Sequence, residues 1–118
     1  MSTRSSRERI LDILESIEEI QQFVASMTFD QFQADRKTMK AVMADFAIMG
    51  EAAGHLPESL TEQHPTVPWS IMRAMRNRLV HVYFSVSPLI LWDTIQQDLP
   101  ALVGPLRQVL VDLDDDGG

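Results

Sequence analysis

Apolar residues recur three or four positions apart along most of the chain, which is the spacing of one face of an α-helix. The first such segment, residues 7–27, is predicted to be a long helix with its acidic residues on the opposite face. Its apolar positions are Ile10, Leu11, Ile13, Leu14, Ile17, Ile20, Val24 and Ala25.

Capping signals predict two helices after this segment. Thr28 followed by Gln31 forms a capping box, which predicts a short helix. Asp35 is the expected N-cap of a second long helix, from residue 36 to about 53. The residues expected to face inward are Met39, Val42, Met43, Phe46, Ala47 and Met49.

Prolines divide the second half of the chain. Residues 56–63 are predicted to form a short amphipathic helix, and residues 67–84 form a helix that opens on Pro68. Ser87 is the expected cap of a last helix, with Pro88 at its first position.

That last helix is expected to run through residues 89–113. Pro100 and Pro105 should kink or divide it, because proline lacks the N–H that a helix interior uses.

These elements predict an all-α fold, an up-and-down bundle in which short loops make consecutive helices antiparallel neighbours. With 118 residues and 45% hydrophobic content, we expect a single domain over residues 1–113. Residues 114–118 are expected to be a disordered acidic tail.

Several functional classes are disfavoured by composition. The sequence has no run of 18 apolar residues and no basic-then-apolar amino terminus, so we expect no membrane partner and a cytoplasmic location. It has no cysteine, which excludes disulfides and thiolate chemistry. His55 and His64 lack partners at metal-ligand spacing and are expected to be loop residues, so neither a metal nor a cofactor is predicted. Glu51 is either an acidic member of a site or a surface residue.

Charge is unevenly distributed on a chain whose net charge is −7. Residues 63–92 contain no Asp or Glu but include Arg73, Arg76 and Arg78. A local cationic site on an acidic body suits a small polyanion, such as a nucleotide or one RNA loop, better than a long duplex, and DNA is not expected. Alternatively, these arginines pair with acidic residues of other helices.

The 67–84 helix carries most of the candidate chemistry. Its expected buried face consists of Ile71, Met75, Leu79 and Val82. With Met72 set to zero, Asn77 lies at roughly 140° and His81 at roughly 180°, so these two side chains are neighbours one turn apart.

Arg76 lies on a different line of this predicted helix. It shares that line with Tyr83, and it diverges from His81 by roughly 140°. Either the helix ends near His81, or a second subunit completes the site.

The segment RNRLVHVY, residues 76–83, resembles the Arg-x4-His-x-Tyr motif of the HepT family of HEPN-domain toxins, including the polar residue after the arginine. The likeness extends to IMGEAAGHLP, to VPW before the motif and to LWDTIQQDLPAL after it, and so covers nearly the whole domain.

The resemblance implies the toxin of a type VII-like toxin–antitoxin pair. Such a toxin is a metal-independent RNA endonuclease, acting on tRNA or mRNA, and its partner is a nucleotidyltransferase antitoxin of the minimal MNT type. The resemblance places Arg76 and His81 in catalysis and makes Tyr83 the position that receives AMP. Histidine suits proton transfer at neutral pH and arginine suits phosphorane stabilisation.

The neighbouring residues fit supporting roles. Asn77 can orient His81, while Arg73 and Arg78 can bind RNA. A homodimer with facing motif helices would bring two copies of Arg76 and His81 to one cleft.

Two other classes of function stay open at this point. One is a nucleotide-binding module or scaffold that holds phosphate without cleaving RNA. The other is a structural helical adaptor whose arginines form salt bridges.

Overall fold

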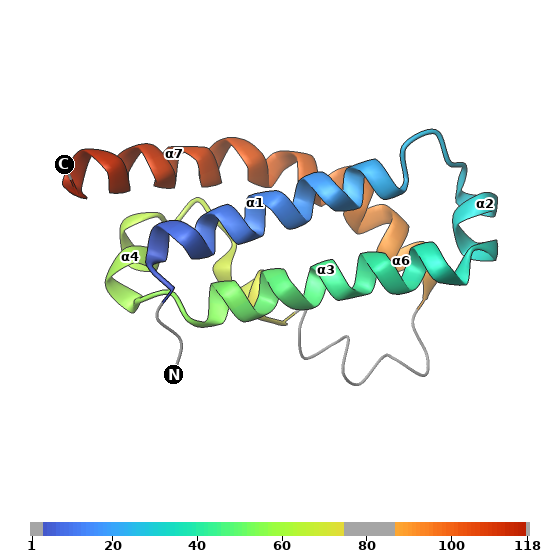
Figure 1. The fold of residues 1–118 in the computed structure, drawn as a ribbon, viewed down its shortest axis with the longest axis horizontal. Coiled ribbons are helices and arrows are strands. Elements are labelled where there is room, and N and C mark those ends of the chain that lie inside the picture. The colour runs from blue at the N-terminus through green and yellow to red at the C-terminus, as the bar shows by residue number, and fades with distance from the viewer. Residues whose placement is uncertain (1–3, 75–86, 118) are drawn as a thin grey trace.

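The chain is a bundle of helices in the computed structural model, which describes residues 4–74 and 87–117 (Figure 1). The elements are α1 (Ser6–Phe23), α2 (Phe29–Ala34), α3 (Arg36–Gly54), α4 (Glu58–Gln63), α6 (Pro88–Asp93), the π-helical segment η1 (Thr94–Asp98) and α7 (Leu99–Gly117). Residues 69–74 are also helical, and the described part contains no strand. The predicted all-α bundle is confirmed. None of the helices in the described ranges is long and apolar enough to cross a membrane.

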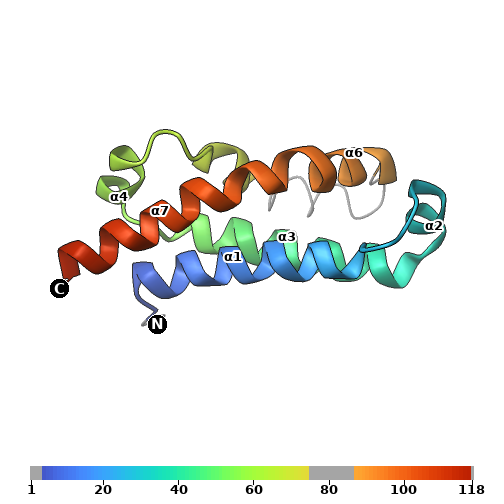
Figure 2. The ribbon, with the colours of Figure 1, turned by 90° about the horizontal axis from the view of Figure 1, so that it is seen from above.

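The helix α1 lies between α3 and α7 and packs most extensively on α3 (Figure 1). Both neighbours run antiparallel to α1 (Figure 1). For α3, this follows from the short connection through α2. The short helix α2 closes one end of the bundle, and α4 lies beside α7 at the other end (Figure 2).

The core is the apolar seam along α1. Ile10, Ile13 and Ile20 are completely buried, and Ile17 is 1% exposed. The same core contains residues of α3 and of the final helices, namely Val42, Phe46, Met49, Ile95, Leu99, Leu102, Leu106 and Val109. The helical spacing of apolar positions therefore predicted most of the buried faces of the long helices. It was wrong at Leu11, which is 37% exposed, and at Ala25, which is also exposed.

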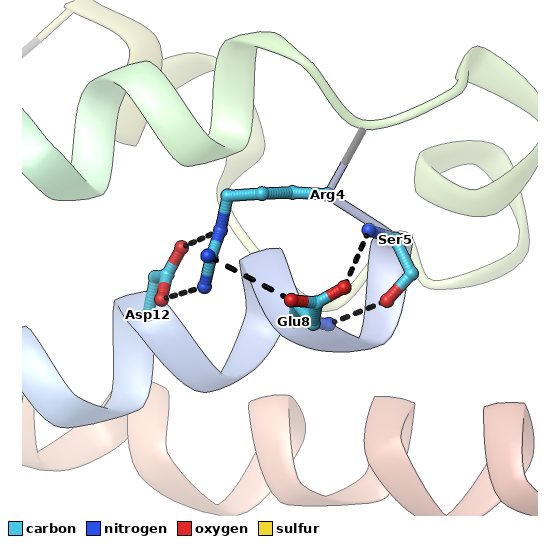
Figure 3. Close-up of polar contacts among 4 residues, drawn as sticks. All are labelled: Arg4, Ser5, Glu8 and Asp12. Carbon is cyan, nitrogen blue, oxygen red and sulfur yellow. Dashed lines mark hydrogen bonds and ion pairs between the residues drawn. The ribbon is translucent and has the colours of Figure 1, made fainter. Parts of the chain in front are cut away.

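The start of α1 is held by a network of polar side chains (Figure 3). Ser5 and Glu8 form a reciprocal capping box, in which each side chain accepts the backbone N–H of the other residue. These hydrogen bonds lower the pKa of Glu8. Arg4 binds both carboxylate oxygens of Asp12, with N···O distances of 2.8 and 2.6 Å.

The capping predictions for the next helices are confirmed. Thr28 and Gln31 form the expected capping box of α2, and Asp35 accepts the backbone N–H of Thr38 at the start of α3. At α6, the Ser87 hydroxyl accepts the N–H of Ile90, and Pro88 occupies the first turn.

The predicted end of the first helix is wrong by about one turn. The helix ends at Phe23, whereas apolar spacing suggested residue 27. Ser26 has a φ of 67°, in the left-handed region that cannot continue a right-handed helix. Chain reversal into α2 therefore begins before the apolar pattern ends.

The expected disturbance at Pro100 takes the form of a π turn. The N–H of Leu99 donates to the carbonyl of Thr94, five residues back, where an α-helix would use a residue four back. Pro100 has no N–H to give to the carbonyl of Gln96, so the wider turn lies where the regular hydrogen-bond ladder is interrupted. Pro105 does not divide the last helix, because α7 continues through it.

The acidic residues 114–116 belong to α7, which extends to Gly117. Arg7 holds Asp114 through an Nε–Oδ1 contact of 2.9 Å, which ties this last turn to α1. No glycine or proline lies between Pro105 and Gly117.

A buried acid interrupts the apolar seam between α1 and α3. Asp45 of α3 is only 5% exposed. Burial raises its pKa to about 6, the negative charges of Glu19 and Glu15 on α1 act in the same direction, and a hydrogen bond with Ser16 opposes them. The native state therefore holds a proton on Asp45 more tightly than the unfolded chain does.

Replacing this carboxylate by a neutral isostere, Asp45→Asn, should stabilise the protein at pH 7 by about 1–3 kcal/mol. Folding raises the pKa of Asp45, so the protonated carboxyl group contributes to the free energy of unfolding at about pH 4. This contribution is lost as pH rises through about 6. The advantage of the variant should therefore grow between pH 4 and 6 and then level off. Urea unfolding of both proteins at several pH values measures it.

The matched control is Asp93→Asn, which neutralises an exposed aspartate. It should change the free energy of unfolding by less than about 0.5 kcal/mol. A difference between Asp45→Asn and the native chain that does not vary from pH 4 to 7 would contradict the assignment.

Candidate functional site

The site predicted from sequence is only partly within the described residues. Five of its six members lie outside them, namely Arg76, Asn77, Arg78, His81 and Tyr83. The buried face expected at Met75, Leu79 and Val82 is also outside them. The sixth member, Arg73, is described, together with the turn of helix that leads into the motif.

That turn begins directly after Pro68. The N–H of Met72 donates to the carbonyl of Pro68 at 3.2 Å, which is the first helical hydrogen bond. Trp69 is 6% exposed and Met72 is completely buried, but Ile71 is 56% exposed. The prediction that Ile71 lies on the buried face is wrong. Trp69 and Ile71 are two residues apart and so lie roughly 200° apart on the helix, and burial of the large Trp69 ring therefore leaves Ile71 on the exposed side.

Arg73 is attached to the end of α3. Its Nε donates to the carbonyl of Ala53 at 3.3 Å. The carbonyls of the last helical turn lack partners within their helix, and they attract cations because of the helix dipole. Within the described ranges, Arg73 forms no ion pair with a carboxylate. For this arginine, the alternative of a salt bridge to another helix is therefore not supported by the described contacts.

Glu51 and His55 form a pair on the surface at the same end of α3. The Glu51 Oε1 and His55 Nε2 atoms are 2.8 Å apart, and the two side chains are 48% and 50% exposed. Their spacing of four residues makes them neighbours on one helical face. This geometry agrees with the surface interpretation of Glu51.

The loop before the motif is fixed by His64, which sequence reasoning treated only as a loop residue. The His64 backbone carbonyl accepts the indole N–H of Trp69 at 3.0 Å. The His64 Nε2 lies 2.9 Å from Asp112 Oδ2 on α7. No local sequence signal could have predicted this pair, because its members are 48 residues apart.

The described titratable groups suggest no metal centre. Residues 4–74 and 87–117 contain no group of three His, Cys, Asp or Glu side chains that could hold a metal ion.

An all-helical bundle carrying the Arg76-x4-His81-x-Tyr83 pattern belongs to the class of HEPN-domain proteins. Residues 13–109 match the family described as "Ribonuclease HepT-like". The chain belongs to this HepT-like family.

Two relatives resemble this chain along nearly their whole length. A Thermococcus cleftensis protein named "Probable ribonuclease HepT" is 38% identical over 106 residues, which is 90% of this chain and 96% of the relative. A Methanocaldococcus jannaschii protein, provisionally named RNase MJ0127, is 35% identical over 114 residues, covering 97% of this chain and 94% of the relative. No solved structure matches this chain.

Proposed function

We propose that this protein is a metal-independent endoribonuclease, the toxin of a toxin–antitoxin pair that acts on cytoplasmic RNA. The observation that carries the proposal is the Arg76-x4-His81-x-Tyr83 motif within a chain that matches the HepT-like ribonuclease family over residues 13–109. The relatives named as ribonucleases support the same activity.

The chemistry requires few groups because RNA carries its own nucleophile. The 2′-oxygen attacks the adjacent phosphorus, and the bond from phosphorus to the 5′-oxygen breaks. The products are a 2′,3′-cyclic phosphate and a 5′-hydroxyl. His81 transfers a proton at one of the two oxygens, and Arg76 stabilises the negative charge that develops on the phosphorane. Asn77, one predicted turn from His81, orients the imidazole.

Arg73 and Arg78 are proposed to bind the flanking phosphates. The contact of Arg73 with Ala53 supports a fixed position for the first of these arginines. The guanidinium group has five N–H donors, and only Nε is used in that contact, so its terminal nitrogens keep donors for a phosphate.

Purified protein should cleave RNA in the presence of EDTA, because none of these steps uses a metal. His81→Ala and Arg76→Ala should lower kcat by at least about 100-fold, since each removes a group that acts in the transition state. Arg73→Ala should mainly raise KM. Gel analysis of RNA fragments, with identification of the cyclic phosphate ends, measures these effects.

The Arg73→Ala variant requires a control for stability, because the hydrogen bond of Arg73 also contributes about 1 kcal/mol to the free energy of unfolding. Arg73→Lys keeps the charge, and thermal unfolding reports whether each variant is folded. A strict Mg²⁺ requirement would refute the mechanism. Intact RNA retained by a folded protein would favour the non-catalytic nucleotide- or RNA-binding module, or a scaffold for a nucleotidyltransferase.

The active form is proposed to be a homodimer. One subunit has a single motif histidine, whereas acid and base act on opposite sides of the scissile bond. A two-fold axis beside the motif segment would supply a second His81 and would remove the need for Arg76 and His81 to lie on one helical face.

Light scattering at assay concentration should therefore give twice the chain mass of 13.4 kDa. As an activity test, His81→Ala subunits mixed in excess with native subunits should suppress cleavage by forming mixed dimers. Full activity of a monomeric species would exclude this arrangement.

Regulation is proposed to act through Tyr83, two residues after His81. A partner nucleotidyltransferase of the MNT type would transfer AMP from ATP to the phenolic oxygen and release pyrophosphate. The new phosphodiester carries a negative charge close in sequence to Arg76 and Arg78. It can therefore occupy the arginines that RNA would otherwise contact.

Incubation with the nucleotidyltransferase, ATP and Mg²⁺ should add one or more AMP groups to the peptide that contains Tyr83 and should abolish cleavage. Tyr83→Phe is the matched variant, because it keeps the ring and removes the attacking oxygen. It should cleave RNA and resist inhibition. Peptide mass spectrometry locates the modification, and AMP on another residue would sink the idea.

A further inference from the structure

His64 joins three parts of the bundle through both its side chain and its backbone. The ring Nδ1 lies 3.0 Å from the carbonyl oxygen of Leu60 in α4, and Nε2 lies 2.9 Å from Asp112 Oδ2 in α7. The His64 carbonyl accepts the Trp69 indole N–H at 3.0 Å and the Val67 N–H at 3.2 Å. One residue therefore connects α4, α7 and the start of the motif helix.

The two described partners of the imidazole ring, the Leu60 carbonyl and the Asp112 carboxylate, are hydrogen-bond acceptors. A carbonyl oxygen cannot donate, and hydrogen bonds from His64 and Gln108 lower the pKa of Asp112, so its carboxyl group is ionised at neutral pH. A neutral imidazole has one N–H and can satisfy one acceptor, whereas the imidazolium ion has two and satisfies both. The His64 side chain is only 12% exposed, so water replaces a lost bond poorly.

The charges around this ring are compatible with the imidazolium form. Asp112 is the charged residue that lines the cavity next to His64, together with the neutral side chains of Ser6 from α1 and Ser59 and Gln63 from α4. Two residues further along α7, Asp114 is paired with Arg7 of α1. The described lining of this cavity thus brings the negative charge of Asp112 to the ring.

We propose that His64, as the imidazolium ion, is a positioning residue that clamps the start of the motif helix to α7. Its effect on RNA cleavage rests on the proposed function, but the clamp itself does not. Protonated His64 fixes the carbonyl that holds Trp69, and Arg73 follows Trp69 by one turn. Ionisation of His64, which lies outside the motif, would then determine how firmly the start of the motif helix is held in position.

The sign of the pH effect follows from the donor count. The clamp is complete at acidic pH, where both ring nitrogens carry protons. As pH rises through the titration of His64, one N–H is lost and one acceptor loses its partner. The hydrogen bond from Trp69 to the His64 carbonyl should then open more often, by about three- to tenfold if one hydrogen bond is lost.

The indole N–H of Trp69 is a direct probe of this clamp in the full chain. The sequence has two tryptophans, so ¹⁵N NMR gives two indole signals, and Trp92→Phe identifies them. We expect the Trp69 signal to shift with the same midpoint as the His64 ring signals between pH 5.5 and 8.5. Its exchange protection, corrected for base catalysis, should fall about three- to tenfold over that range.

Two variants separate the clamp from general effects of pH. His64→Gln can reach Asp112 but does not titrate, so its Trp69 signal should be independent of pH. His55→Gln removes an exposed histidine and should titrate like the native chain. If His64→Gln does not fold, Asp112→Asn is the second variant. It removes the charge that favours the imidazolium ion, and it should move the midpoint to lower pH.

The cleavage assay adds an independent readout. At saturating RNA, His64→Gln should lower kcat severalfold with little change in KM, and His55→Gln should be unchanged. If the native chain cleaves no RNA, the proposed function fails, and the NMR titration alone decides on the clamp. A Trp69 signal that ignores pH in the native chain, or that titrates equally in His64→Gln, would overturn the clamp.

Discussion

The structure depends on the double-sided burial of α1. Its isoleucines at positions 10, 13, 17 and 20 face a common core with α3 and α7, so one helix holds the other two together. Within the described residues, α3 and α7 each pack more extensively on α1 than on each other. Burial of each isoleucine contributes about 2 kcal/mol. Asp45 works against this seam, because it places a carboxyl group where the same packing excludes water.

The two ends of the bundle are closed in different ways. At the α2 end the contacts are aromatic: Trp92 lies 6.2 Å from Phe29 and 5.3 Å from Phe32 between ring centroids. At the α4 end the contacts are polar and directional, and they converge on His64. Aromatic contacts tolerate small shifts, whereas hydrogen bonds fix distances and respond to protonation. The start of the motif helix is at the polar end, where a small change in ionisation can alter geometry.

Which features could be predicted from the sequence depends on how far apart in the chain the interacting residues lie. The caps at Thr28, Asp35 and Ser87 involve residues three positions apart, so local patterns were sufficient. Long apolar faces repeat over several turns, and these too were predicted. The orientation of Ile71 and the pairing of His64 with Asp112 depend on distant parts of the chain, which periodicity cannot detect. The capping box of Ser5 with Glu8 was a local signal that was available but was not used.

The chain is acidic overall but contains a cationic segment. The contacts of its acidic side chains explain how both features occur in one protein. Glu8 and Asp35 cap helices, Asp12 and Asp114 bind arginines of the amino-terminal region, and Asp112 binds His64. These carboxylates are thus engaged in holding the bundle together. Arg73, in contrast, is held by a backbone carbonyl, which positions the side chain without neutralising its charge. An acidic protein can in this way present fixed positive charge to a polyanion. Among the described residues, Arg73 is thus a fixed positive charge in the segment from residue 63 to 92, which has no acidic residue.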